Sequence, residues 1–224
     1  IDFIGPLGFD GVWIDCEHGP VDFADIGNMT RACDLWGMTS LVRVNLNEYG
    51  VIYRTLDQGA QGVTVPHVNT ADEAREVVHA AKFAPIGLRG SSLTRQGYGV
   101  DDYHAMANDG MFIAIMIEDV VGVKNLPDIL KVDHIDSIIV APGDLAQTMG
   151  YLGQMEHPVV QKAVDKAIEQ IIDSGKVAGA LAFDSLVDHY VGNGVKFLFT
   201  PWERWLSAGA RNYLDKVSAA SQRL

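Results

Sequence analysis

The sequence predicts a single-domain barrel of alternating β-strands and α-helices. Three observations predict it: short apolar segments recur along the 224 residues, segments with helix signals lie between them, and no composition shift marks a second domain. A doubly wound open sheet is the alternative, but no G-x-G-x-x-G motif follows a predicted strand. We therefore expect an α/β fold, a (βα)₈ barrel, over residues 1–224.

The predicted strands are short, rich in Val and Ile, and apolar at nearly every position, which is typical of strands buried on both faces. They are residues 11–16, 40–44, 62–66, 112–117, 136–141, 177–182 and 196–200. An eight-stranded barrel needs one more. Residues 1–10 have no signal-peptide pattern and are typical of a helix end entering a strand. We expect the first barrel strand to precede Ile1.

The connecting segments carry helix signals. Thr70 and Glu73 have the spacing of a capping box, in which each side chain bonds the other residue's backbone N–H. Pro158 is placed in the first turn of another helix, which Gly175 ends. Residues 83–110 contain many Gly and Pro, so we expect a long irregular segment of functional importance there.

The composition limits the partners. Lys and Arg number 17 and Asp and Glu 29, a formal net charge of −12, which argues against a nucleic-acid or anionic-membrane surface. No apolar run approaches the roughly 18–20 residues of a membrane helix. The two cysteines, Cys16 and Cys33, form neither a disulfide framework nor a metal-ligand repeat. We expect small-molecule partners and a reducing, cytoplasmic location.

Polar residues follow several predicted strands, where a parallel barrel has its active site. Glu118 and Asp144 end two strands, and carboxylate oxygens suit Mg²⁺ or Mn²⁺. Either residue alone is more readily explained as stabilising a helix N-terminus, but the two together favour a metal site. Arg43 lies within an apolar strand, so it must pair with Asp15 or Glu17 or face a polar cavity.

Two histidines also follow strand ends. His18 has acidic neighbours that can fix its tautomer, although a lone histidine is more often structural or exposed. His67 is a weaker candidate on the same logic, and we leave it out of the predicted catalytic set.

These residues resemble the HpcH/HpaI family of class II pyruvate aldolases. Matching order and spacing run from about residue 9 to residue 194. The motifs that carry the resemblance are Asp15-x-Glu17-His18-x-Pro20, Arg43, Pro66, Pro85-x-Gly87-x-Arg89-Gly90, Glu118 and Pro142-x-Asp144-Leu145.

The resemblance implies a barrel of the phosphoenolpyruvate/pyruvate type whose divalent cation is held by Glu118 and Asp144. Mg²⁺ or Mn²⁺ is expected, with Co²⁺ or Zn²⁺ also suitable. The implied reaction is reversible cleavage of a 4-hydroxy-2-oxoacid to pyruvate, or a close 2-oxoacid, and an aldehyde through a metal-stabilised enolate. The resemblance further implies a homo-oligomer, a hexamer, in which a C-terminal helix at residues 202–217 is exchanged between subunits.

The resemblance also implies roles for the other residues. His18 matches the catalytic base, and Asp57 matches the acid that pairs with it. Arg43 matches the residue that steadies the keto oxygen. The backbone N–H groups of Gly143 and Asp144 match those that hold the substrate carboxylate.

Three departures from the family pattern motivate alternatives. Met116 stands where a Gln is usual, Cys16 replaces a Gly and is expected to narrow the pocket, and the last strand runs into Thr200-Pro201-Trp202. We therefore expect an unusual acceptor aldehyde. The alternatives are an oxaloacetate decarboxylase or another carbon–carbon-forming enzyme that uses the same enolate, and a non-catalytic 2-oxoacid-binding barrel.

Overall fold

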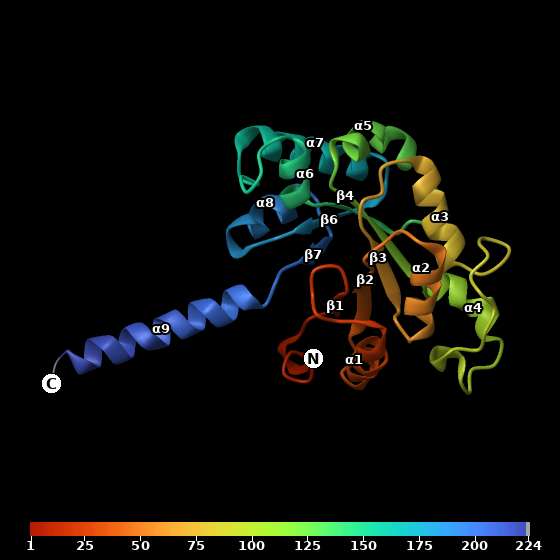
Figure 1. Cartoon of the computed structure of the whole chain (residues 1–224), viewed down its shortest axis with the longest axis horizontal. Helices are drawn as coiled ribbons and strands as arrows, with labels where there is room; N and C mark the ends of the chain where they lie inside the picture. The colour runs from red at the N-terminus through yellow and green to blue at the C-terminus, as the bar shows by residue number, and fades with distance from the viewer. Residues whose placement is uncertain (223–224) are drawn as a thin grey trace.

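A computed structural model describes residues 1–222 and contains one sheet of seven parallel strands, whose order in space is their order in the chain (Figure 1). The strands are β1 (Gly11–Asp15), β2 (Thr39–Arg43), β3 (Gly62–Val65), β4 (Phe112–Ile117), β5 (Ser137–Val140), β6 (Val177–Leu181) and β7 (Phe197–Phe199). A doubly wound sheet reverses its strand order at a switch point, and this sheet does not. The expected barrel is therefore confirmed, nearly closed by these seven strands.

Helices connect the strands and cover the outside of the barrel, except the last helix, which projects away from it (Figure 1). They are α1 (Phe23–Leu35), α2 (Tyr49–Asp57), α3 (Ala71–Ala81), α4 (Tyr103–Gly110), α5 (Val120–Ile129), α6 (Pro142–Thr148), α7 (Pro158–Asp173), α8 (Val187–Gly192) and α9 (Glu203–Ser221), with short 3₁₀ turns η1 (Gly5–Leu7), η2 (Arg95–Gly97) and η3 (Asp184–Leu186). The predicted capping box is confirmed, since Glu73 N donates to Thr70 Oγ1 at 3.1 Å and Thr70 N donates to Glu73 Oε2 at 3.0 Å. The segment predicted as irregular also contains η2 and α4.

Alternate residues of each strand face opposite sides of the barrel wall. In β4, Ile113, Ile115 and Ile117 belong to the large core cluster between strands and helices. Ala114 and Met116 belong to a second cluster inside the barrel, together with aromatic side chains of β1, β4 and β7. The next residue with the same inward alternation is Glu118, so the strand pattern places this carboxylate at the mouth of the barrel.

The first and last strands meet through side chains. The Trp13 ring of β1 stacks on Phe199 of β7, with ring centroids 4.3 Å apart, but the two strands are not hydrogen-bonded neighbours in residues 1–222. A cavity of about 490 Å³ lies at this seam, and its lining is mainly apolar and includes Trp13, Phe199 and Trp202. Because the carboxylates of the mouth do not line this cavity, it is not the candidate active site.

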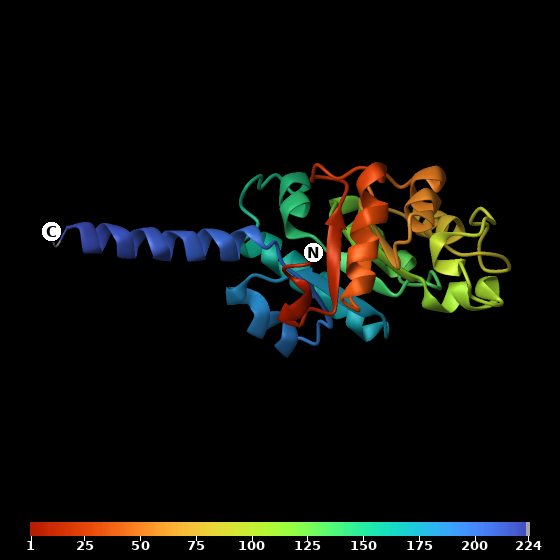
Figure 2. The same cartoon turned by 90° about the horizontal axis from the view of Figure 1, so that it is seen from below.

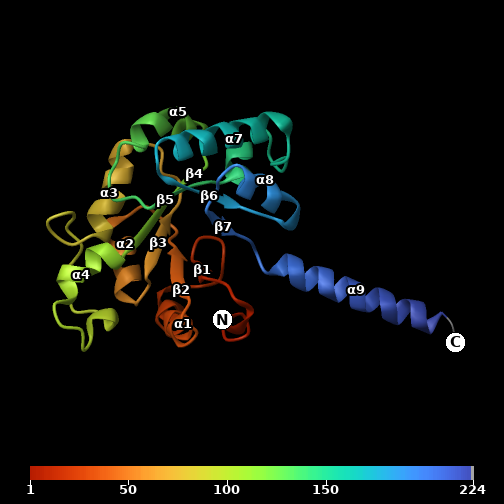
Figure 3. The same cartoon turned by 180° about the vertical axis from the view of Figure 1, so that it is seen from behind.

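Helix α9 leaves the barrel after β7 and extends away from it (Figures 2 and 3). None of its residues is buried, although Leu206, Tyr213 and Leu214 are each more than 60% exposed and apolar or aromatic. Its first turn contacts the barrel side, since the Trp205 ring stacks on Phe9 with centroids 5.6 Å apart and the Arg204 guanidinium lies 3.3 Å from the Phe183 ring centroid. Among residues 1–222, no helix is both long enough and apolar enough to cross a membrane.

The buried Lys82 gives a test of the fold. Its ammonium group donates hydrogen bonds to the backbone carbonyls of Asn108 and Met111, and so ties the end of α3 to the segment before β4. We expect Lys82→Met to lower the free energy of unfolding by roughly 1–3 kcal/mol in urea titrations, because buried carbonyls lose charged donors. Lys131→Met is the matched control, since the Lys131 side chain is 76% exposed, and equal effects of the two substitutions would contradict this role.

Candidate active site

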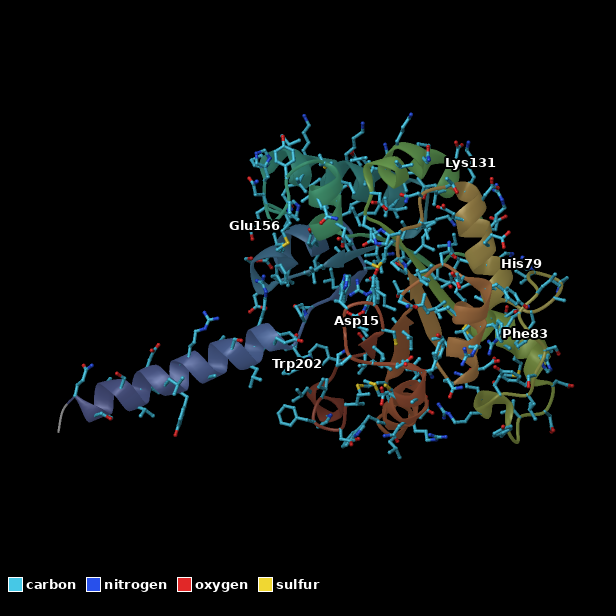
Figure 4. The ribbon with its side chains drawn as sticks, in the orientation of Figure 1. Asp15, His79, Phe83, Lys131, Glu156 and Trp202 are labelled. Atoms are coloured by element: carbon cyan, nitrogen blue, oxygen red, sulfur yellow. The ribbon has the colours of Figure 1, made fainter. Side chains whose placement is uncertain are left out.

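The positively charged side chain of Arg43 is held in place at the mouth of the barrel, between β1 and β2. Asp15 and Arg43 are register partners at the ends of these strands. Arg43 Nε donates to Asp15 Oδ1 at 2.9 Å and Nη2 to Asp15 Oδ2 at 2.5 Å, while Nη1 lies 2.9 Å from Glu17 Oε2. Figure 4 shows Asp15 near the middle of the molecule. The expectation that Arg43 pairs with Asp15 or Glu17 is therefore confirmed for both.

This pairing keeps the groups charged. Burial alone would raise the pKa of Asp15, but the hydrogen bond and charge of Arg43 outweigh it and hold that pKa below 3.8. Burial would lower the pKa of Arg43, and Asp15, Glu17 and Glu118 together raise it instead. The guanidinium is thus a permanent, immobile positive charge at the mouth.

The loop after β1 has a defined local structure. Asp15 Oδ1 accepts hydrogen bonds from the backbone N–H groups of Glu17 and His18, at 3.0 and 3.3 Å. A Cβ on Gly19 would lie 2.4 Å from the Asp15 carbonyl oxygen, so the turn requires glycine there. The His18 side chain is 63% exposed at this mouth, with Nε2 3.8 Å from Glu17 Oε2.

Glu118 is the most deeply buried carboxylate of the site, with 1% of the residue exposed. Its Oε1 accepts a 2.7 Å hydrogen bond from the backbone N–H of His67. Burial raises the pKa of Glu118 to about 7; the His67 contact opposes this rise, and the negative charges of Glu17 and Asp144 add to it. A carboxylate so placed lacks an adequate positive counter-charge.

His67 contributes more to the site than the sequence indicated. Its backbone is left-handed, with φ of 52°, which turns its N–H toward Glu118. Its ring Nδ1 lies 3.0 Å from Asp119 Oδ2, which also accepts from Asn69 Nδ2 at 3.0 Å. These contacts fix the imidazole beside Glu118. The position of His67 after a strand was the signal that the sequence offered for these contacts.

Gly143 and Asp144 lie in the first turn of α6, directly after β5. Backbone N–H groups in a first helical turn have no partner within the helix, so they are available to an anion. A Cβ on Gly143 would meet nothing within 4 Å, so the space beside it is open. Asp144 is close enough for its charge to raise the pKa of Glu118.

Asp57 does not lie at the mouth of the barrel. It ends α2, which runs from the end of β2 to the start of β3, so it lies at the end of the barrel away from the mouth. Its Oδ1 accepts a 2.8 Å hydrogen bond from Nη2 of Arg89, whose side chain is fully buried. The structure of one chain therefore does not bring Asp57 to His18, its expected partner.

The departures from the family pattern also have structural outcomes. Met116 is 2% exposed and packs with the apolar cluster inside the barrel, directly below Glu118 on the same strand. Cys16 packs against the outer core between strands and helices, so the expectation that it narrows the pocket is not supported. Trp202 is 54% exposed at the base of α9 (Figure 4).

The donor set fits a divalent cation. Glu118 and Asp144 supply carboxylate oxygens, which hard cations prefer. A cation between them would supply the counter-charge that buried Glu118 lacks. No group of three or more His, Cys, Asp or Glu side chains is arranged to hold a metal within residues 1–222, so the fit depends on two protein ligands. Such a site leaves positions open for a substrate.

The fold and the residues at its mouth define a parallel βα-barrel that gathers buried Glu118, a fixed arginine and the N-terminus of α6 at the carboxyl ends of its strands. Residues 2–193 match the model of the HpcH/HpaI aldolase/citrate lyase family. The chain belongs to this family.

Several relatives are similar over most of their length. The 4-hydroxy-2-oxo-heptane-1,7-dioate aldolase of Escherichia coli is 37% identical over 218 residues, which cover 95% of this chain and 83% of that protein. The hydroxypyruvate/pyruvate aldolase of Roseobacter denitrificans is 36% identical over 202 residues, covering 88% and 79%. The crystal structure of an HpcH/HpaI aldolase/citrate lyase family protein from Burkholderia cenocepacia J2315 has a TM-score of 0.92 at 28% identity and covers 97% and 89%.

The raised pKa of Glu118 predicts a pH-dependent stability. The folded protein holds this proton more tightly than the unfolded chain, whose glutamate has an ordinary pKa of 4.5. The resulting stability is full below pH 4.5 and is lost as pH rises through about 7. In EDTA, we expect wild type to lose roughly 3 kcal/mol relative to Glu118→Gln between pH 4.5 and 8.

Urea unfolding at several pH values measures this difference. Glutamine keeps an oxygen that can accept from His67, so the comparison isolates the charge. Glu169→Gln, on an exposed position of α7, is the control and should follow wild type. Parallel stability curves for wild type and Glu118→Gln would contradict the predicted burial of this charge.

Proposed function

We propose that this protein is a divalent-metal-dependent class II aldolase that reversibly cleaves a 4-hydroxy-2-oxoacid to pyruvate, or a close 2-oxoacid, and an aldehyde. The observation that carries the proposal is the buried Glu118 carboxylate at the mouth, close enough to Asp144 and to the fixed Arg43 guanidinium for their charges to interact. The named relatives are aldolases, which supports the same reaction class.

Glu118 and Asp144 would hold the metal, and when bound it supplies Lewis-acid stabilisation of charge on the 2-oxo oxygen. We assign Arg43 to the same oxygen, because a preorganised cation stabilises charge that develops in the transition state. We assign the N–H groups of Gly143 and Asp144 to the substrate carboxylate, since the first turn of α6 is open and faces an anion favourably.

His18 is the proposed base. Cleavage of the C3–C4 bond requires removal of the proton from the C4 hydroxyl group, and an imidazole nitrogen can accept such a proton. The loop that Asp15 orders holds the His18 backbone at the mouth while its side chain stays accessible. We propose that Asp57 completes this pair from a neighbouring subunit, since it lies away from His18 within one chain.

We also propose a homo-oligomer, a hexamer by family resemblance, with α9 packed on a neighbouring subunit. Helix α9 buries no side chain in its own chain, although Leu206, Leu214 and Val217 are apolar. Apolar helix surface of this size needs a cover in a stable protein. A cytoplasmic location and the choice of Mg²⁺ or Mn²⁺ remain predictions, and the free Cys16 and Cys33 are compatible with a reducing compartment.

The activity is tested by pyruvate release from 4-hydroxy-2-oxo-heptane-1,7-dioate and shorter 4-hydroxy-2-oxoacids, followed with lactate dehydrogenase. We expect turnover to stop in EDTA and to return with Mn²⁺ or Mg²⁺, because the charge on the 2-oxo oxygen then regains its stabilisation. Glu118→Gln and Asp144→Asn should each lower kcat/KM at least about 100-fold.

A binding measurement accompanies the activity. We expect Mn²⁺ to raise the Tm of wild type and to have little effect on Glu118→Gln. Undiminished turnover of Glu118→Gln would refute the proposal. Faster turnover of oxaloacetate than of every hydroxy-oxoacid would favour the decarboxylase alternative, and metal binding with no turnover on any substrate would favour a binding barrel.

The proposed assembly has its own test. Leu206→Asp combined with Leu214→Asp places two charges on the uncovered face of α9, and we expect it to reduce the mass measured by light scattering after gel filtration. Arg211→Asp is a control of the same helix at an exposed polar position. An unchanged mass for the double variant would show that α9 does not hold the assembly together.

A further inference from the structure

A second, smaller cavity lies beside the carboxylate site. Its volume is about 170 Å³, and the β2–α2 and β3–α3 loops form it at the same mouth of the barrel. Its lining residues are Asn45, Leu46, Asn47, Pro66, His67 and Glu73. His67 belongs both to this lining and to the surroundings of Glu118, so the cavity borders the site where bond cleavage would occur.

The wall that the cavity shares with the carboxylate site is rigid. Asp119 holds the His67 ring through Nδ1 at 3.0 Å, and the His67 N–H is bound to Glu118. The His67 Nε2 lies 3.7 Å from the nearer Glu17 oxygen, beyond hydrogen-bond distance. One ring nitrogen is thus committed to positioning the imidazole, and the other remains for a ligand.

The opposite wall of the cavity carries two asparagine side chains. Asn45 is exposed at the rim, and its side chain makes no hydrogen bond within residues 1–222. Asn47 donates one weak bond of 3.3 Å to the Glu73 carbonyl and keeps its amide oxygen free. Amide and imidazole groups both donate and accept, which suits the hydroxyl groups of a ligand.

Size and charge narrow the ligand further. At about 170 Å³ the cavity is smaller than the roughly 300–1,000 Å³ typical of sites for drug-sized ligands, so it suits only a small molecule. No lysine or arginine lines it in the described part of the chain, whereas Glu73 does and Asp119 lies behind His67. A ligand that carries a carboxylate would meet repulsion there.

We propose that this cavity, the acceptor cavity, binds the aldehyde partner of the reaction and selects a small uncharged hydroxyaldehyde through Asn45, Asn47 and His67. This rests on the proposed aldolase function. It separates the protein from its Escherichia coli relative, whose named substrate carries carboxylates at both ends.

The test compares two acceptors in the direction of synthesis, with pyruvate and Mn²⁺: glyceraldehyde, which is uncharged, and succinic semialdehyde, which carries a carboxylate. We expect wild type to show at least a tenfold higher kcat/KM for glyceraldehyde. Asn45→Lys should lower this preference at least tenfold, because an ammonium group at the rim attracts the carboxylate. Asn28→Lys, at an exposed position of α1 outside the cavity, should keep the wild-type preference.

A second variant tests the assignment independently, in case Asn45→Lys does not fold. His67→Asn keeps a residue that tolerates the left-handed backbone but shortens the side chain. We expect it to raise the KM for glyceraldehyde about five- to tenfold while changing the KM for pyruvate less than twofold. Equal changes in both KM values would indicate a structural role and overturn the assignment.

Deuterium exchange into the methyl group of pyruvate, measured by NMR without any aldehyde, separates the two levels of the proposal. Absence of exchange in the metal-loaded wild type would overturn the aldolase function itself. Exchange in wild type, together with a preference for succinic semialdehyde or a preference that Asn45→Lys leaves unaltered, would overturn the acceptor cavity alone.

Discussion

The candidate site depends on one costly arrangement: the Glu118 carboxylate is buried beside other acids. Burial disfavours its charge, and Glu17 and Asp144 disfavour it further, so that its pKa rises to about 7. The barrel imposes this arrangement, because the alternation along β4 that packs Ala114 and Met116 inside also directs Glu118 inward. In the proposed function, a divalent cation bound by Glu118 would relieve this repulsion, and the proposed metal dependence would then follow from the strand pattern.

Positive charge at the mouth is distributed in a way that suits an enolate. Arg43 is bound by both Asp15 and Glu17, so its positively charged guanidinium group is oriented with little freedom. His67 is held by Asp119 on the far side of Glu118. Arg43 and His67 are therefore each bound to a carboxylate, which fixes the orientation of the side chain before a substrate binds.

The fold was predictable because its signals are local. Apolar runs of five or six residues marked all seven strands, and the Thr70–Glu73 capping box marked the start of α3. The positions of Arg43, Glu118 and Asp144 at or just after strand ends were predictable from the alternation of strands and helices, and their roles stay predictions. The position of Asp57 was not predictable, since only the direction of α2 shows that the helix carries it away from the mouth. The contacts of His67 were not predictable either, because neither its left-handed backbone nor its approach to Asp119 is visible in the sequence.

The backbone of His67 has a consequence for substitutions at this position. Its φ of 52° lies in the left-handed region, which β-branched side chains rarely adopt. Val, Ile or Thr at this position would strain the turn after β3 and draw the backbone N–H away from the Glu118 carboxylate, which it binds at 2.7 Å. This turn is therefore sensitive to the shape of a side chain that is itself half exposed.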